Sequence, residues 1–233
     1  MQYRESNDDS DNDSDELKFF DMGVESENIQ ARWGVIQCSA DPVDTGCLHP
    51  ITEDAGGSGR DGNSYWIHSV EVHGTVRSPP WSASESYASW AKAPSDIRLQ
   101  LLLDKDCQAG FSRFDHMEQG TAGCSAVFDY VNQHQDLTYK RRFEILDDQR
   151  IILSPQVSTW ALKGTYTTTY YHFSPGAVEK WESYYEFDPP LRVTCSGTTG
   201  DRTEILDNCL AIVGVSYDTD VEVSFISRVR FSD

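Results

Sequence analysis

From Ala31 onward, most of this sequence alternates apolar and polar residues with a period of two. The clearest run spans residues 221–231, where an apolar face alternates with a polar one: Val221, Val223, Phe225, Val229 and Phe231 against Glu222, Ser224, Arg228 and Arg230. Antiparallel strands buried on one face produce this alternation, whereas parallel strands, which are buried on both faces, have nearly continuous apolar runs. The pattern therefore predicts an all-β protein built from antiparallel sheets.

Several other segments carry the same pattern. Strands are expected at 65–77, 97–104, 139–146 and 162–173. In the first of these, the alternation turns four side chains to the core: Trp66, Val70, Val72 and Val76. His68 lies on that apolar face, so we expect a hydrogen-bonded core histidine rather than a metal ligand. The run 210–215 is apolar on both faces and is predicted to be a central strand.

The connections between these runs are rich in glycine and proline, as in 54–63, which holds four glycines, and at 189–190, where two prolines are adjacent. Helix is scarce. A capping box at 82–85 predicts a short helix that continues to Trp90, and 125–132 is compatible with a further turn or two. Eight or nine strands with long irregular connections predict a sandwich, a closed barrel or a jelly roll.

The sequence is strongly acidic. Its 233 residues hold 38 Asp plus Glu against 19 Lys plus Arg, which gives a formal net charge of −19. Residues 1–30 hold ten of the acids and two of the bases, and are predicted to be a disordered or extended N-terminal segment. Residues 31–233 are predicted to form one domain. Phosphate binding requires clustered Lys and Arg, so this composition excludes tight binding of nucleic acid by net charge.

No membrane partner is expected. The sequence has no run of 18 apolar residues, which a spanning helix would need. Its first residues have neither the basic region nor the apolar region of a secretory signal.

Catalytic and metal-binding motifs are missing. We find no GxSxG, HExxH, GxGxxG or phosphate-loop motif, so we expect no enzymatic activity, no catalytic residues and no cofactor. The six cysteines lack zinc-ligand spacing and are expected to be mostly free and buried, with Cys38 and Cys47 as the pair to check for a disulfide. Two carboxylate pairs stand at predicted strand ends: Asp104 with Asp106, and Asp147 with Asp148. Acidic turns are the expected interpretation; a glycosidase centre and a calcium site at a subunit contact are the lesser alternatives.

Four segments, in order, resemble the capsid proteins of small circular Rep-encoding single-stranded DNA viruses. They are GNSYWIHSVEVHGTV at 62–76, IRLQLLLDKD at 97–106, YKRRFEILDDQRIIL at 139–153, and NCLAIVGVSYD with VEVSFISRVRFSD at 208–233. The resemblance implies a single eight-stranded viral jelly roll, similar to that of satellite tobacco necrosis virus, with two four-stranded antiparallel sheets and short helices in loops. With strands named B to I, it places them near 32–38, 65–77, 97–104, 139–146, 160–173, 184–195, 209–217 and 221–231.

The resemblance also implies a function. Proteins of this kind are structural coat proteins that self-assemble into a small icosahedral shell, in the smallest case of 60 copies, around a circular single-stranded DNA genome. They are located in the virion and, during assembly, in the host nucleus or cytoplasm. The sequence identifies no host receptor. Four tryptophans in or near predicted loops are candidate interface anchors, with core positions as the alternative: Trp81, Trp90, Trp160 and Trp181.

In this family the sheet that contains strands B, I, D and G tends to face the genome. Four arginines then share the non-core face of that sheet and are the candidate nucleic-acid-binding residues: Arg32, Arg98, Arg228 and Arg230. Solvated surface arginines are the alternative interpretation.

The sequence departs from the family at its start, where an acidic segment stands in place of an arginine-rich arm. Either a basic segment precedes this sequence, or packaging works differently, or the shell assembles without nucleic acid. Two other classes of function stay open. A carbohydrate-binding or hydrolytic jelly-roll protein would be a monomer, and an acidic nucleoplasmin-like chaperone would form a small ring.

Overall fold

A computed structural model describes residues 17–29, 34–36, 46–54, 59–77, 95–107, 134–135, 137, 140–153, 157–161, 169–173, 178–216 and 221–233. Its strands are β1 (Lys18–Asn28), β2 (Gly34–Val35), β3 (Ser64–Arg77), β4 (Ser95–Asp104), β5 (Phe143–Leu153), β6 (Val157–Ala161), β7 (Thr169–Phe173), β8 (Val178–Thr194), β9 (Cys209–Ser216) and β10 (Glu222–Ser232). One 3-10 helix, η3, covers Arg202–Glu204. The prediction of an all-β, antiparallel protein is confirmed for these residues. Among them, no helix has the length and apolar character needed to cross a membrane.

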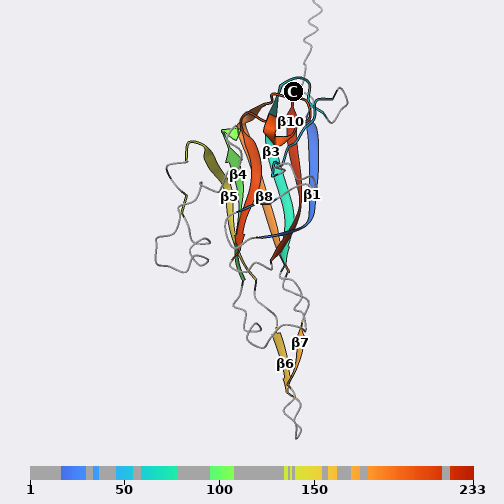
Figure 1. Ribbon diagram of the computed structural model, residues 1–233, viewed down its shortest axis with the longest axis vertical. Helices are drawn as coiled ribbons and strands as arrows, with labels where there is room; N and C mark the ends of the chain where they lie inside the picture. The colour runs from blue at the N-terminus through green and yellow to red at the C-terminus, as the bar shows by residue number, and fades with distance from the viewer. Residues whose placement is uncertain are drawn as a thin grey trace, which may run out of the picture.

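The strands form two antiparallel sheets that pack face to face (Figure 1). The first sheet, which we call the β1–β8 sheet, has the order β1-β10-β3-β8. The second, the β2–β5 sheet, has the order β2-β9-β4-β5. Its member β2 is only two residues long, so three full-length strands and one short bridge replace the four strands predicted for this sheet.

The apolar core lies between the two sheets. Alternate residues of β10 point into it, among them Val223, Phe225 and Val229, as the period-two pattern predicts. The prediction that 210–215 is a central strand is also confirmed: β9 lies between β2 and β4, and all eight of its residues are buried.

Residues 18–28 were assigned to the N-terminal segment, but they form β1, an edge strand that pairs with β10. The ordered sheet therefore begins well before residue 31. Phe20, Met22 and Val24 alternate with exposed neighbours and pack against the core. An edge strand has one hydrogen-bonded side and one solvent side, so it tolerates the charges that made this segment resemble a disordered tail.

The expectation for Trp66 was wrong, because β3 has an irregularity opposite the prolines of β8. Ile67 pairs with Leu191 and Ser69 pairs with Glu186, so the register shifts at His68. Beyond a bulge of this kind, the residues that would have faced the core face the solvent, and the reverse. Trp66 is consequently exposed, whereas Val70 and the apolar residues beyond it face the core as predicted.

The predicted strand at 160–173 is instead a separate hairpin. Strands β6 and β7 pair only with each other in the described structure, and the hairpin extends beyond the end of the sandwich (Figure 1). The helices predicted at 82–90 and 125–132 lie outside the described residues.

Candidate nucleic-acid interface

The structure brings together only two of the four predicted arginines. Arg228 and Arg230 lie on the exposed face of β10, in the β1–β8 sheet, as predicted. Arg98 lies on β4, in the other sheet, so the prediction that it shares their face is wrong. Arg32 lies outside the described residues. The error arises because β1 was not predicted. The segment at 32–38 was therefore named B instead of C, and each later strand before β8 received the letter of the strand before it.

Arg98 has a local partner on its own sheet. Its Nε donates to Asp148 Oδ1 at 2.7 Å, and Gln100 Nε2 donates to the other oxygen of the same carboxylate at 2.9 Å. The neighbouring β5 residue Arg150 similarly donates to Asp96 Oδ1 at 2.7 Å. These cross-strand pairs link β4 to β5.

The exposed face of the β1–β8 sheet is not uniformly basic, because acidic side chains stand opposite its arginines. Arg228 donates to both oxygens of Asp21, at 2.7 and 2.6 Å, and this hydrogen bonding lowers the pKa of the Asp21 carboxyl. Arg77 donates to Glu222 at 2.7 Å. A phosphate group that binds here must therefore compete with carboxylates that the same sheet supplies.

Two exposed aromatic rings on this sheet lie under arginines. The Phe19 ring of β1 has the Arg228 guanidinium 5.5 Å and the Arg230 guanidinium 5.9 Å from its centroid. Across the sheet, Arg192 lies 5.9 Å from the centroid of Trp66. Exposed aromatic and guanidinium groups are the surfaces on which unpaired bases stack. Neither ring was predicted as a surface group: Phe19 lies in an acidic segment that resembles a tail, and the alternation placed Trp66 on the core face.

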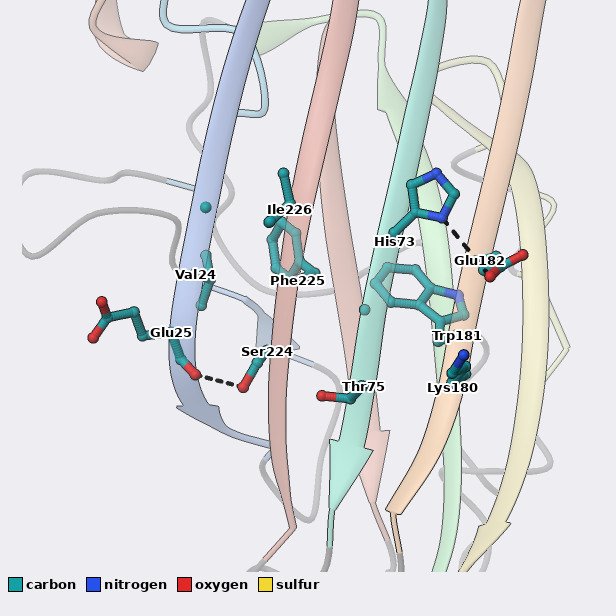
Figure 2. A pocket seen from close by; sticks show the side chains of 12 residues that line it. Val24, Glu25, His73, Thr75, Lys180, Trp181, Glu182, Ser224, Phe225 and Ile226 are labelled. Carbon is teal, nitrogen blue, oxygen red and sulfur yellow. Dashed lines mark hydrogen bonds and ion pairs between the residues drawn. The ribbon is translucent and has the colours of Figure 1, made fainter.

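A shallow groove of about 660 Å³ opens on the same sheet, at Gly23 of β1 and Gly74 of β3 (Figure 2). Gly23 has no side chain on the exposed face, which leaves a gap beside Ile226, whereas Gly74 faces the core between Trp181 and Phe225. Gly74 is required for packing, because a Cβ there would lie 2.7 Å from the Ser224 carbonyl oxygen and 2.9 Å from Phe225 Cβ. The rim carries charges of both signs, from Glu25, Lys180 and Glu182.

The two predicted carboxylate pairs do not converge. Asp104 is fully buried and accepts two hydrogen bonds from Arg142, each 2.9 Å, and one from Arg202 at 3.1 Å. Asp106 donates its amide to Asp104 Oδ1. Farther along the β4–β5 pairing, Asp147 accepts from Gln149 and Asp148 accepts from Arg98. Guanidinium groups occupy the oxygens of Asp104 and Asp148, which a calcium ion at either pair would need.

Among the described residues, the group that could hold a metal ion is a different one: Cys47, His49 and Cys209, all buried. The described cysteines, Cys47, Cys107, Cys195 and Cys209, are free and buried, as expected; Cys38 lies outside the described residues. Burial lowers the pKa of His49 to about 3, so its imidazole is neutral. His68 Nε2 lies 2.9 Å from Ser232 Oγ, which agrees with a hydrogen-bonded histidine.

Comparisons with known proteins give no family assignment. No family model matches the sequence, and no curated protein matches it. Among solved structures, the chain is similar to the BFDV capsid protein in the crystal structure of a 60-mer, with 7% sequence identity over 93% of this chain and 92% of that one. The TM-score is 0.27, a value that does not establish a shared fold.

Proposed function

We propose that this chain is the coat protein of a small single-stranded DNA virus of the circular Rep-encoding kind, and that it self-assembles into an icosahedral shell. The observation that carries the proposal is the strand order. If the strands of the two sheets are named B to I in chain order, omitting the β6–β7 hairpin, the orders β1-β10-β3-β8 and β2-β9-β4-β5 become B-I-D-G and C-H-E-F. That is the arrangement which the resemblance implies for a viral jelly roll.

The position of the resembling segments supports the same proposal. The four segments that resemble coat proteins fall on β3, on β4, on β5, and on β9 with β10. These strands are neighbours within each of the two sheets, so the resemblance extends over both sheets rather than one local motif. Repeated copies of such a subunit can form a closed shell, because closed symmetry lets one surface serve at every equivalent contact.

In this proposal the β1–β8 sheet faces the genome. Arg228 and Arg77 of this sheet have carboxylate partners, so we expect DNA binding that is weak and sensitive to salt. Its main contacts would be Arg228, Arg230 and the exposed aromatic rings. The acidic residues that precede β1 add repulsion rather than attraction. Packaging, if it occurs, then depends on many weak subunit contacts.

Assembly is tested by size. We expect the purified chain to form uniform particles in negative-stain microscopy. If sixty 26.3 kDa chains assemble, sedimentation should give a particle mass of about 1.6 MDa. A stable monomer would contradict the proposal and favour a carbohydrate-binding protein. A small ring would contradict it and favour an acidic chaperone.

DNA binding is tested by the salt dependence of the subunit's affinity for a fluorescent single-stranded oligonucleotide. Removing two phosphate contacts in the double variant Arg228→Ala, Arg230→Ala should make the slope of log K against log salt shallower by about 1.4. The matched control removes two arginines of the other sheet, Arg98→Ala with Arg150→Ala, and should leave the slope unchanged. Equal slopes for the wild type and the β10 variant would exclude this face as the DNA contact.

A further inference from the structure

A compact group of sulfur and nitrogen donors lies beside the start of β9. Cys47 forms an isolated antiparallel β-bridge with Ala211, and the Leu48 amide donates to the Leu210 carbonyl at 2.9 Å. These backbone contacts hold the segment 46–51 against β9. As a result, Cys47 Sγ, a ring nitrogen of His49 and Cys209 Sγ all lie within 4.8 Å of one another. All three residues are at most 2% exposed.

A fourth donor comes from the residues just after β4. The Cys107 thiol is near enough to the Cys209 thiol to affect its pKa, but it is not among the three donors that lie within 4.8 Å of one another. Cys107 Sγ donates to the Asp104 carbonyl at 3.4 Å. A third thiol, from another part of the chain, therefore neighbours the group of Cys47, His49 and Cys209.

We propose that Cys47, His49 and Cys209 bind a structural zinc ion, and that the neighbouring Cys107 thiol becomes its fourth ligand. Three cysteines and one histidine are a common ligand set for structural zinc, which prefers four sulfur and nitrogen donors in a closed tetrahedron. The site is buried, as a structural rather than a catalytic zinc site should be. This inference rests on the four side chains and does not depend on the proposed coat function.

The surroundings of His49 resemble the support that zinc-bound histidines receive. Nδ1 lies 2.6 Å from Tyr65 Oη, while Nε2 accepts the Leu210 amide at 2.9 Å, so the proton belongs on Nδ1. A zinc ion bound to Nε2 would replace the amide contact and keep the Nδ1–H bond to Tyr65, which fixes the ring orientation. The exchange would leave the buried Leu210 amide without this acceptor, a cost that the zinc–ligand bonds together must exceed.

The backbone of His49 also contacts one of the thiols. Its amide donates to Cys47 Sγ at 3.4 Å, a contact that a zinc-bound thiolate would keep. A bound ion would connect the segment before β3, the end of β4 and the start of β9.

The direct test measures metal in the full chain. Protein purified under reducing conditions, with zinc in the growth medium, should contain about one zinc ion per chain by elemental analysis. Replacement with Co²⁺ should give the thiolate-to-cobalt charge-transfer band and the visible bands of a tetrahedral site. Wild-type protein that carries no zinc and gives no such bands would overturn the proposal, whatever the variants do.

Two single variants separate a metal site from ordinary core thiols. Cys209→Ser and the matched control Cys195→Ser each change one buried cysteine, with folding checked by circular dichroism. We expect at least a tenfold loss of Co²⁺ affinity in Cys209→Ser and wild-type affinity in Cys195→Ser. Equal affinity in both variants would overturn the proposal. A Cys47–Cys209 disulfide found by mass spectrometry of the unreduced native protein would also overturn it.

Discussion

Replacing Asp104 with Asn is expected to lower the free energy of unfolding by about 3–5 kcal/mol, because it removes the charge that two arginines share in a buried place. The Asp104 side chain is fully buried, and the side chain of Arg202 is only 1% exposed. Arg142 donates two of the hydrogen bonds to Asp104, and this bonding raises the pKa of the Arg142 guanidinium. Asn matches the shape of Asp but cannot balance the guanidinium charges.

The matched control is Asp96→Asn on the same strand. Asp96 pairs with Arg150, whose side chain is 49% exposed, so water can replace the lost partner. We expect a change of about 1 kcal/mol or less for this variant. Both values come from urea unfolding curves followed by circular dichroism. If Asp104→Asn and Asp96→Asn cost the same, Asp104 is not the centre of a buried charge network.

Much of the fold can be predicted from the period-two alternation alone. The strands near 65–77, 97–104 and 221–231 were found within a few residues of β3, β4 and β10. The alternation is informative there because one face of each strand is buried in a shared core. A continuous apolar run was enough to identify β9 as central, because both of its faces are buried.

The errors have identifiable physical causes. The segment that forms β1 does alternate, as Phe20, Met22 and Val24 show, but its acidic neighbours made it resemble a tail. Because β1 pairs with β10, from the opposite end of the chain, no local pattern reveals its partner. Once β1 was missed, the strand names before β8 shifted by one, and Arg98 was assigned to the wrong sheet.

The buried donor group could not be predicted for a related reason. Cys47 and His49 are two residues apart, which is a local signal, but Cys209 joins them only because the segment around Cys47 pairs with β9. Ligand spacing in sequence reports metal sites formed within one hairpin or loop. A site made by sheet topology has no such spacing.

The structure also shows how the net charge of the protein limits its binding of DNA. A net charge of −19 excludes binding of DNA by overall attraction, and the β1–β8 sheet is not a basic surface that escapes this rule. Asp21 balances the charge of Arg228, and Glu222 balances that of Arg77. Any contact with single-stranded DNA must therefore gain from base stacking on Phe19 and Trp66 as well as from phosphate contacts.

Replacing Trp181 with Ala is expected to lower the free energy of unfolding by about 3–5 kcal/mol, because it empties a large volume in the core. Trp181 was a candidate interface anchor, but its side chain is 1% exposed. Its ring packs edge-on against Phe225, with centroids 6.1 Å apart, and Gly74 lies between these residues in the register.

The control is Tyr184→Ala on the same strand, which removes an aromatic ring that is 56% exposed. It should change the free energy of unfolding by about 0.5 kcal/mol or less, since little packing is lost. Both variants are measured by chemical unfolding of the unassembled chain, so that subunit contacts do not contribute. If Trp181→Ala leaves the stability of the unassembled chain unchanged but prevents particle formation, then Trp181 acts at a subunit contact, and its placement in the core is wrong. A large loss of stability in the unassembled chain would instead assign its role to the sandwich, because a buried ring stabilises the fold before any partner is present.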